Sequence, residues 1–489
     1  MKKNWSGAGY DALILTFVRI VTMLISMVTF KLLAITFSVE DYGTYASAIL
    51  VSTTVISLTI LGLTDAINYF YAKDRNVERG RVYVYTIFAI QFVIGVAVAL
   101  ILIILKDPIA AYFKNPSVAA LIPAVAFLPL LTNSANMLHV VFVTAKKAKV
   151  IAIRNFIISV LKIIMITAVC LLSKKIYLII IITLILEFGN VIYMLLYCKK
   201  YIFRIDITKA NPGLVKEILC YSIPMAAYIL TNSLSKNMDK LVIGALGSSQ
   251  MVGMYSIASK ELPFDILTAS FLTVLVPYIT RYMGDENFQG ASVLFSKYIQ
   301  LTYLITWIVA GGALVCSKEL MRILYDQKYL PALSIFCLYT VVDMLKFANV
   351  SIIFSISNKA KELLCYSGAA LLLNAILNIA LFKMFGMPGP AIATVIVTVL
   401  LSCVITFRSS QLLKVRVSAL LNLKQMIFIT CEYLIFGILA FGVKILLADK
   451  IPTLLTFIIA YGIYAVPLLV INRKKIVSLL KDINKAELT

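Results

Sequence analysis

Long apolar runs separated by short polar segments are the main feature of this chain. A helix needs about 20 apolar residues to cross the hydrocarbon of a bilayer, and fourteen runs approach or exceed that length. They cover residues 12–37, 43–70, 82–105, 118–144, 150–172, 176–198, 214–246, 251–282, 295–316, 330–357, 362–385, 388–412, 424–448 and 452–472. The pattern predicts an all-α polytopic membrane protein with about 14 transmembrane helices.

One pattern occurs twice along the chain, about 210 residues apart. The segment KLLAITFSVEDYGTYASA leads into one apolar run with Gly43 at its turn, and KLVIGALGSSQMVGMYSIAS leads into another with Gly253 at the same place. The tripeptide Lys-Ala-Lys at 147–149 recurs at 359–361 with nearly the same offset. These echoes indicate a duplicated membrane bundle, an arrangement that usually places a solute site between the two copies.

The duplication predicts three parts: a lobe of six spans at 1–205, a second lobe of six spans at 206–414, and a helical hairpin with a cytoplasmic tail at 415–489. An even number of spans in each copy means that both copies cross the membrane in the same direction. We therefore expect a pseudo-two-fold axis along the membrane normal. The prolines inside long runs are candidate bending points, namely Pro224, Pro263 and Pro277.

The distribution of charge predicts the orientation of the chain in the membrane. The chain is 61% hydrophobic and 14% charged, with a net charge of +22. Alternate loops differ strongly in Lys and Arg content, and the richer set contains both termini. By the positive-inside rule both termini are cytoplasmic, and the basic excess reports topology and not nucleic-acid binding. The N-terminal segment MKKNWSGAGYDA is interpreted as an uncleaved cytoplasmic leader.

Several classes of chemistry find no support in the sequence. The eight cysteines are scattered without a CxxC pair, so neither a disulfide framework nor a metal site is predicted. His139 is the single histidine and is interpreted as a packed polar residue. A phosphate-binding GxxxxGK[ST] motif is absent. We therefore expect no cofactor and no metal.

Ionisable residues inside apolar runs are costly and usually face a protein interior or water. In the run 214–246, Asn232, Lys236, Asp239 and Lys240 share one face at helical spacing. Arg19 and Lys260 add positive charge in two other runs. A surplus of positive charge in a wet cavity favours an anionic solute, because Lys and Arg both bind phosphate.

Four further residues are candidates for ion coupling or a secondary cavity: Lys162, Glu187, Asp343 and Lys346. A simpler interpretation stays open for some of these charges. Lys236 with Asp239, and Asp343 with Lys346, have the spacing of structural ion pairs on one helix.

The chain resembles a known family over nearly its whole length. The segments EDYGTYASAILVSTTVISLTILGLTDAINYF, SIPMAAYILTNSLSKNMDKLVIGALGSSQMVGMYSIASKE and FGMPGPAIATVI resemble the Wzx-like polysaccharide flippases of the multidrug/oligosaccharidyl-lipid/polysaccharide exporter superfamily. The resemblance implies a two-lobe helical bundle that moves undecaprenyl-diphosphate-linked oligosaccharide by alternating access. It also implies a cationic central cavity, which at matching positions here would include Arg19, Asp65, Asn68, Lys236, Lys240 and Lys260.

The resemblance implies a bacterial cytoplasmic (inner) membrane protein that is not an enzyme. Its expected partners are a polyprenyl-diphosphate-linked glycan, the lipid bilayer, and a polysaccharide polymerase and glycosyltransferases. Three alternatives stay open. One is a proton- or sodium-coupled drug or metabolite exporter of the same superfamily. Another is a lipid II flippase, although the arginine-rich first helix of that branch is represented only by Arg19. The third is a membrane glycosyltransferase or polymerase, against which the short external loops count.

Overall fold

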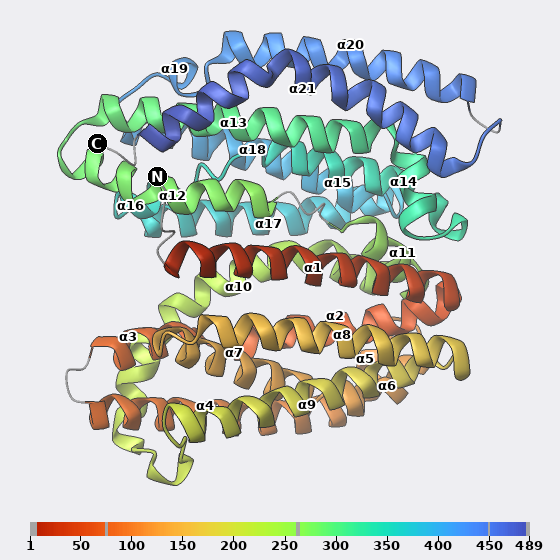
Figure 1. Cartoon of the computed structure of the whole chain (residues 1–489). Helices are drawn as coiled ribbons and strands as arrows, with labels where there is room; N and C mark the ends of the chain where they lie inside the picture. The colour runs from red at the N-terminus through yellow and green to blue at the C-terminus, as the bar shows by residue number, and fades with distance from the viewer. Residues whose placement is uncertain (1–6, 74–76, 261–264, 448–449, 486–489) are drawn as a thin grey trace. The chain divides into compact units, whose positions relative to one another are not determined.

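The computed structural model describes residues 7–73, 77–260, 265–447 and 450–485, and within these ranges its regular secondary structure is entirely helical (Figure 1). The chain forms two compact units, Met1–Met254 and Tyr255–Thr489. The first unit contains α1 (Gly7–Thr36), α2 (Val39–Thr59), α3 (Leu63–Lys73), α4 (Val77–Ile104), α5 (Lys106–Tyr112), α6 (Ser117–Val125), α7 (Leu128–Thr144), α8 (Ala148–Leu172), α9 (Ile176–Tyr201), the short 3-10 turns η1 (Ile207–Lys209) and η2 (Pro212–Leu214), and α10 (Val215–Leu246).

Helix α11 (Ser249–Ala258) contains the boundary between the two units. The second unit continues with α12 (Asp265–Gly284), α13 (Phe288–Val315), α14 (Ser317–Leu324), η3 (Gln327–Ala332), α15 (Leu333–Leu345), α16 (Ile352–Ile356), α17 (Ala360–Phe385), α18 (Gly389–Leu412), α19 (Val417–Leu421), α20 (Leu423–Leu447) and α21 (Thr453–Lys485). The division into lobes at 1–205 and 206–414 stays a prediction.

Twelve helical segments of the described residues are long and apolar enough to cross a membrane. Each overlaps one of the fourteen predicted runs. The run predicted at 330–357 is not one continuous helix, because α15 ends at Leu345 and the short helix α16 follows at Ile352–Ile356. The run at 12–37 corresponds to α1, in which Ile20–Thr36 is apolar but shorter. The run at 251–282 contains α11 and α12, with residues 261–264 outside the described ranges. The predicted all-α polytopic fold is confirmed.

The two copies of the repeated segment begin their helices in the same way. The Ser38 side chain accepts a hydrogen bond from the amide of Asp41 (3.0 Å) at the start of α2. The Ser248 side chain accepts one from the amide of Met251 (3.3 Å) at the start of α11. A serine in this position satisfies a backbone donor that the first helical turn leaves without a partner. The helix start therefore follows directly from the repeated sequence.

The Lys-Ala-Lys echo also marks one turn used twice. Lys146 and Asn358 have positive φ values of 59° and 56°. In each case the next residue, Lys147 or Lys359, donates its amide to a carbonyl five residues earlier, at 2.8 and 2.7 Å. This left-handed cap ends one helix and allows the next, α8 or α17, to begin immediately.

Gly43 and Gly253 bring two backbones together within the first unit. A Cβ atom on Gly253 would lie 2.6 Å from the Cα of Gly43, a separation that real side chains essentially never have. Small residues permit such approaches between membrane helices, where dispersion contacts and not water exclusion hold helices together. The glycine of each repeat copy is thus required by the contact with the other.

Aromatic packing and hydrogen bonds hold α10 within the first unit. The rings of Tyr69 on α3 and Tyr221 on α10 stack at 4.4 Å. The hydroxyl of Tyr83 on α4 donates to the carboxylate of Glu217 on α10 (2.8 Å). A buried cluster from α3, α4, α7 and α9 lies behind these contacts and includes Leu63, Ile67, Val84, Met137, Leu138 and Met194.

Helix α13 is the most deeply buried span of the second unit. The hairpin α20–α21 packs along it (Figure 1). Tyr433 donates to the Leu304 carbonyl and Tyr464 to the Trp307 carbonyl, both at 2.9 Å. A Cβ on Gly311 would overlap the Tyr464 hydroxyl, so glycine at this position makes room for the tyrosine. The C-terminal hairpin is therefore an integral part of this unit.

The predicted bending points are only partly described. Pro224 lies inside α10 and Pro277 lies inside α12. Pro263 falls within 261–264, outside the described residues. The role of these prolines in bending stays a prediction.

Candidate functional site

The polar row predicted in the 214–246 run lies on α10. Asn232 and Lys236 are exposed, Lys240 is half-buried, and Asp239 is buried at 1% exposure. Spacings of four and three residues keep these side chains on one side of the helix. One carboxylate among two ammonium groups leaves the row net positive, which suits an anion. Their role in substrate binding stays a prediction.

Contacts along α10 fix the level of this row relative to α3. A Cβ on Gly62, which has a φ of 66° and directly precedes α3, would touch Ser222 and Ala226 of α10. Lys236 lies ten residues beyond Ala226, which is about 15 Å along a helix axis. The Ser57 and Ser233 hydroxyls hydrogen bond near the level of the row, so α2 is its neighbour there.

Asp65 and Asn68, which the family resemblance adds to the site, lie on α3. Asp65 is half-buried in the first turn, where a negative charge is stabilised by the helix dipole. Asn68 is exposed and accepts a hydrogen bond from the Thr144 hydroxyl (3.4 Å). Both residues belong to the same unit as the α10 row. The start of α3, however, is about three helical turns along α10 from Lys236.

The other predicted residues lie on or beside other helices. The side chain of Arg19, on α1, lies outside the described residues. Lys260 follows α11 and is half-buried. Asp343 is buried near the end of α15, and Lys346 is exposed just after it. The coupling role suggested for Asp343 and Lys346 stays a prediction.

Within the first unit there is a polar cavity of about 420 Å³, bounded by α1, α7, α8 and α9. It is lined by Thr22, Met23, Ser26, Thr132, Ala135, Asn136, His139, Arg154, Asn155, Ile158, Ser159, Glu187 and Asn190. Glu187 was among the predicted residues, whereas Lys162, predicted with it, is not in the lining. His139, predicted to be a packed polar residue, lines the cavity.

Sequence reasoning missed Arg154, Asn155 and Asn190. Each stands inside an apolar run, which was a usable signal, because polar residues within membrane spans usually face a protein interior. Only the packing of α8 against α1 and α9 places them on one cavity.

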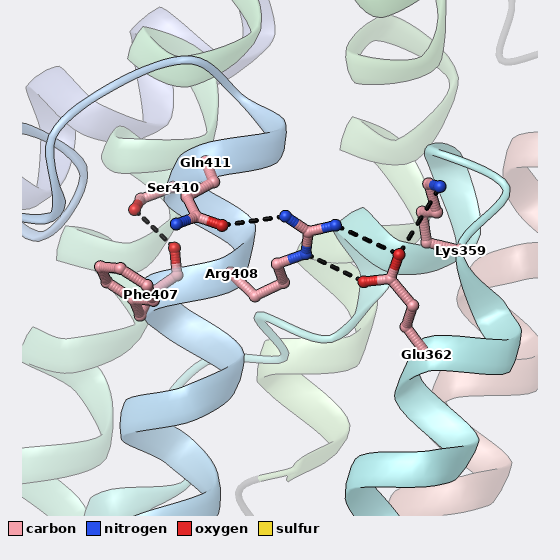
Figure 2. Close-up of polar contacts among 6 residues, drawn as sticks. All are labelled: Lys359, Glu362, Phe407, Arg408, Ser410 and Gln411. Atoms are coloured by element: carbon pink, nitrogen blue, oxygen red, sulfur yellow. Dashed lines mark hydrogen bonds and ion pairs between the residues drawn. The ribbon is translucent and has the colours of Figure 1, made fainter.

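A second missed feature is a cluster of charged residues where α17 and α18 meet (Figure 2). The guanidinium of Arg408 donates two hydrogen bonds to the carboxylate of Glu362, at 2.9 and 3.2 Å, and a third to Gln411 at 2.9 Å. The ammonium of Lys359 lies 3.6 Å from the same carboxylate. Two parallel bonds fix the pair in one geometry, so this cluster joins the ends of two helices.

A third feature lies beside the C-terminal hairpin. Lys444 on α20 lies 3.4 Å from the carboxylate of Glu319 on α14 and donates to the Val315 carbonyl at 2.7 Å. Both side chains are buried, at 11% and 8% exposure. Burial, with Glu319 adding to it and Lys444 opposing it, raises the pKa of the nearby Cys316 thiol to about 11. These contacts hold α20 against α13 and α14.

Comparison with known proteins identifies the family. A family model described as "Polysaccharide biosynthesis protein" matches residues 32–334, more than half of the chain. The chain belongs to this polysaccharide biosynthesis protein family. The family resemblance predicted from the repeated segments is therefore confirmed.

Curated relatives of this family member match over a short stretch. A protein named "Probable lipid II flippase MurJ" from Chlamydia muridarum is 27% identical over 100 residues. That stretch covers 20% of this chain and 18% of the relative, so the chain spans less than a fifth of that protein's length. A protein of the same name from Chlamydia trachomatis matches to the same extent.

Two solved structures match this chain over most of its length. An inward closed conformation of the lipid II flippase MurJ has a TM-score of 0.72 at 15% identity and covers 95% of this chain and 100% of that one. An inward-facing multidrug resistance MATE transporter of the MOP superfamily has a TM-score of 0.66 at 14% identity and covers 83% and 98%. At these identities the likeness shows that the chain shares the fold of these two proteins.

Proposed function

We propose that this polysaccharide biosynthesis protein is a flippase for undecaprenyl-diphosphate-linked oligosaccharide in the bacterial cytoplasmic membrane. The observation that carries the proposal is the net positive row Asn232, Lys236 and Lys240, with Asp239, on a membrane-spanning helix. Such charges are costly in lipid and persist where they serve a path or a site. In a chain of this family, the matching anion is the diphosphate of a lipid-linked glycan.

Moving the diphosphate across the membrane requires the loss of its hydration shell. An unpaired anion in hydrocarbon is far less stable than in water. Ammonium groups of lysine and the amide of asparagine replace part of its hydration shell. The polyprenyl tail remains in lipid while the head group passes through the protein by alternating access, with Pro224 and Pro277 as candidate bending points.

The proposal includes the topology. Both termini lie in the cytoplasm, and two lobes, 1–205 and 206–414, are related by an axis along the membrane normal, with the hairpin 415–489 appended. The excess of Lys and Arg in the loops that share a side with the termini supports this orientation. Reporter fusions at the two termini and in alternate loops test it directly.

The experiment is complementation of a bacterial strain that lacks its own polysaccharide flippase, with surface polymer as the readout. Lys236→Ala and Lys260→Ala are expected to abolish export while the protein remains at normal levels in the membrane. Lys209→Ala, an exposed lysine of η1, is the matched control and should export normally. Full export by the double Ala variant would reject the proposal, as would resistance to cationic dyes without any export.

A second candidate substrate is lipid II. The 100-residue match to a protein named as a probable lipid II flippase favours it, and both substrates share a polyprenyl diphosphate. Rescue of a strain depleted of its lipid II flippase would support this candidate. Rescue of polymer export alone would support the oligosaccharide substrate.

A further inference from the structure

The polar cavity of the first unit holds opposite charges on two of its walls. Arg154 is on α8 and Glu187 is on α9, and both line the cavity. Each charge is oriented by a neutral amide. The guanidinium of Arg154 donates to the side-chain oxygen of Asn155 and also contacts the sulfur of Met194. The carboxylate of Glu187 accepts from the Asn190 amide (3.3 Å).

One contact gives the separation of the two charges along the axis of α9. Arg154 contacts Met194, which is seven residues from Glu187 on the same helix, or about 10 Å along its axis. Two charge-assisted hydrogen bonds of about 2.8 Å each would leave roughly 5 Å between the cationic and anionic atoms of a ligand that joined them. A primary ammonium and a phosphoryl oxygen separated by a two-carbon link span this distance.

The Glu187 side of the cavity is rich in acceptors. The side-chain oxygen of Asn190 is buried and accepts no hydrogen bond from any residue that the structure describes. A buried acceptor without a donor destabilises the protein, because it has lost its hydrogen bonds to water. An ammonium group, with three donors, would serve both this oxygen and the carboxylate.

We propose that this cavity binds a zwitterion of the phosphoethanolamine type, with its phosphate at Arg154 and its ammonium at Glu187. The volume of about 420 Å³ lies within the range of small-molecule sites, about 300–1,000 Å³. A lone anion or a lone cation would engage only one of the two protein charges. Lys162, the other cation of α8 near Glu187, is not in the lining. This site is independent of the proposed flippase function.

The same chemistry has two sources, a free phosphoethanolamine or the head group of phosphatidylethanolamine. Large apolar side chains stand exposed beside the cavity residues, including Phe156 next to Asn155 on α8 (40% exposed) and Phe188 next to Glu187 on α9 (56% exposed). The acyl chains of such a lipid would contact these faces while its head group occupied the cavity. The experiment separates the two sources.

The first measurement uses wild-type, full-length protein purified in detergent and freed of phospholipid. Binding of phosphoethanolamine is measured by calorimetry and by the shift in thermal unfolding, beside phosphocholine, inorganic phosphate, ethylamine and glycine. Phosphoethanolamine is expected to bind at least about tenfold more tightly than each of the others, since loss of one bond to a charged group costs about 1.5–3 kcal/mol. Phosphate binding as tightly as phosphoethanolamine, or no binding of any compound, would overturn the proposal.

The second measurement uses variants. Arg154→Gln and Glu187→Gln should each weaken phosphoethanolamine binding about tenfold or more. Arg281→Gln and Asp285→Asn remove members of an exposed Arg–Asp pair of the second unit and should bind as the wild type does. If Glu187→Gln binds phosphoethanolamine like the wild type, the assignment of the ammonium is wrong. The wild-type ligand series decides the matter should a variant fail to fold.

The third measurement identifies the source. Native mass spectrometry of protein from nanodiscs that contain equal phosphatidylethanolamine and phosphatidylglycerol reports which lipid is retained. Preferential retention of phosphatidylethanolamine, lost in Glu187→Gln, supports the lipid source. Equal retention of the two lipids together with tight binding of free phosphoethanolamine supports the soluble source. Preferential retention of phosphatidylglycerol contradicts the zwitterion site.

Discussion

Gly253 has no room for a side chain because it lies directly against the backbone of Gly43. A Cβ on Gly253 would lie 2.6 Å from the Cα of Gly43, and a Cβ on Gly43 would overlap the carbonyl oxygen of Ser249. The atoms in conflict belong to the backbone, so rotation of a side chain cannot relieve them. Each glycine that marks the repeated segment therefore lies against the backbone of the other copy.

Substitution of either glycine by alanine should destabilise the protein. Gly43→Ala and Gly253→Ala are each expected to lower the free energy of unfolding by about 1–3 kcal/mol, although alanine is the better helix former. Thermal unfolding in detergent, followed by size-exclusion chromatography, measures this. Gly462→Ala is the control, because no atom lies within 4 Å of its added Cβ; equal melting of all three variants would contradict the close contact.

Removal of Lys444 should leave Glu319 as an uncompensated buried charge. Lys444→Met is expected to cost roughly 3–5 kcal/mol of stability, the usual effect of breaking a buried ion pair. The double variant Lys444→Met with Glu319→Met should recover much of the loss, because neither charge remains. Denaturation in a graded detergent series gives the three values. A double variant as unstable as the single one would count against the ion pair as the cause.

The thiol of Cys316 should resist alkylation at neutral pH. Its pKa is raised from 9.0 to about 11, chiefly by burial and then by Glu319, and only the thiolate reacts. The rate of iodoacetamide labelling at this position, read by peptide mass spectrometry, should keep rising until about pH 11. In Glu319→Gln the rise should occur at lower pH, since the variant removes a negative charge. A plateau near pH 9 in the wild type would contradict the raised pKa.

The lysine row on α10 should depend on charge. Lys236→Gln is expected to reduce glycan transport about tenfold or more, because a bond from a charged donor is worth about 1.5–3 kcal/mol. Lys236→Arg keeps the charge and should retain most activity. A proteoliposome assay with a labelled polyprenyl-diphosphate oligosaccharide measures the rate. Loss of transport in the Arg variant with normal transport in the Gln variant would exclude an electrostatic role.

Properties of the fold that depend on local sequence were predictable. Apolar run length determines which helices cross a membrane, and the recurring turn at Lys146 and Asn358 uses chain-local chemistry. Features that require distant helices to meet were not. Arg154 and Glu187 are 33 positions apart in sequence, and no periodic pattern says that α8 and α9 turn them toward one cavity. Lys444, near the end of an apolar run, resembles the many lysines that extend to the membrane surface, yet it is buried against Glu319.

The contacts of the C-terminal hairpin with α13 have an evolutionary consequence. Tyr433, Tyr464 and Lys444 all donate to main-chain carbonyls, those of Leu304, Trp307 and Val315. Every amino acid supplies a main-chain carbonyl, so these three hydrogen bonds do not depend on which side chains α13 carries at the accepting positions. The hydrogen bonds therefore require retention of the three donors in homologous sequences but no particular side chain at the acceptors, and an alignment of relatives would record these bonds on one partner only.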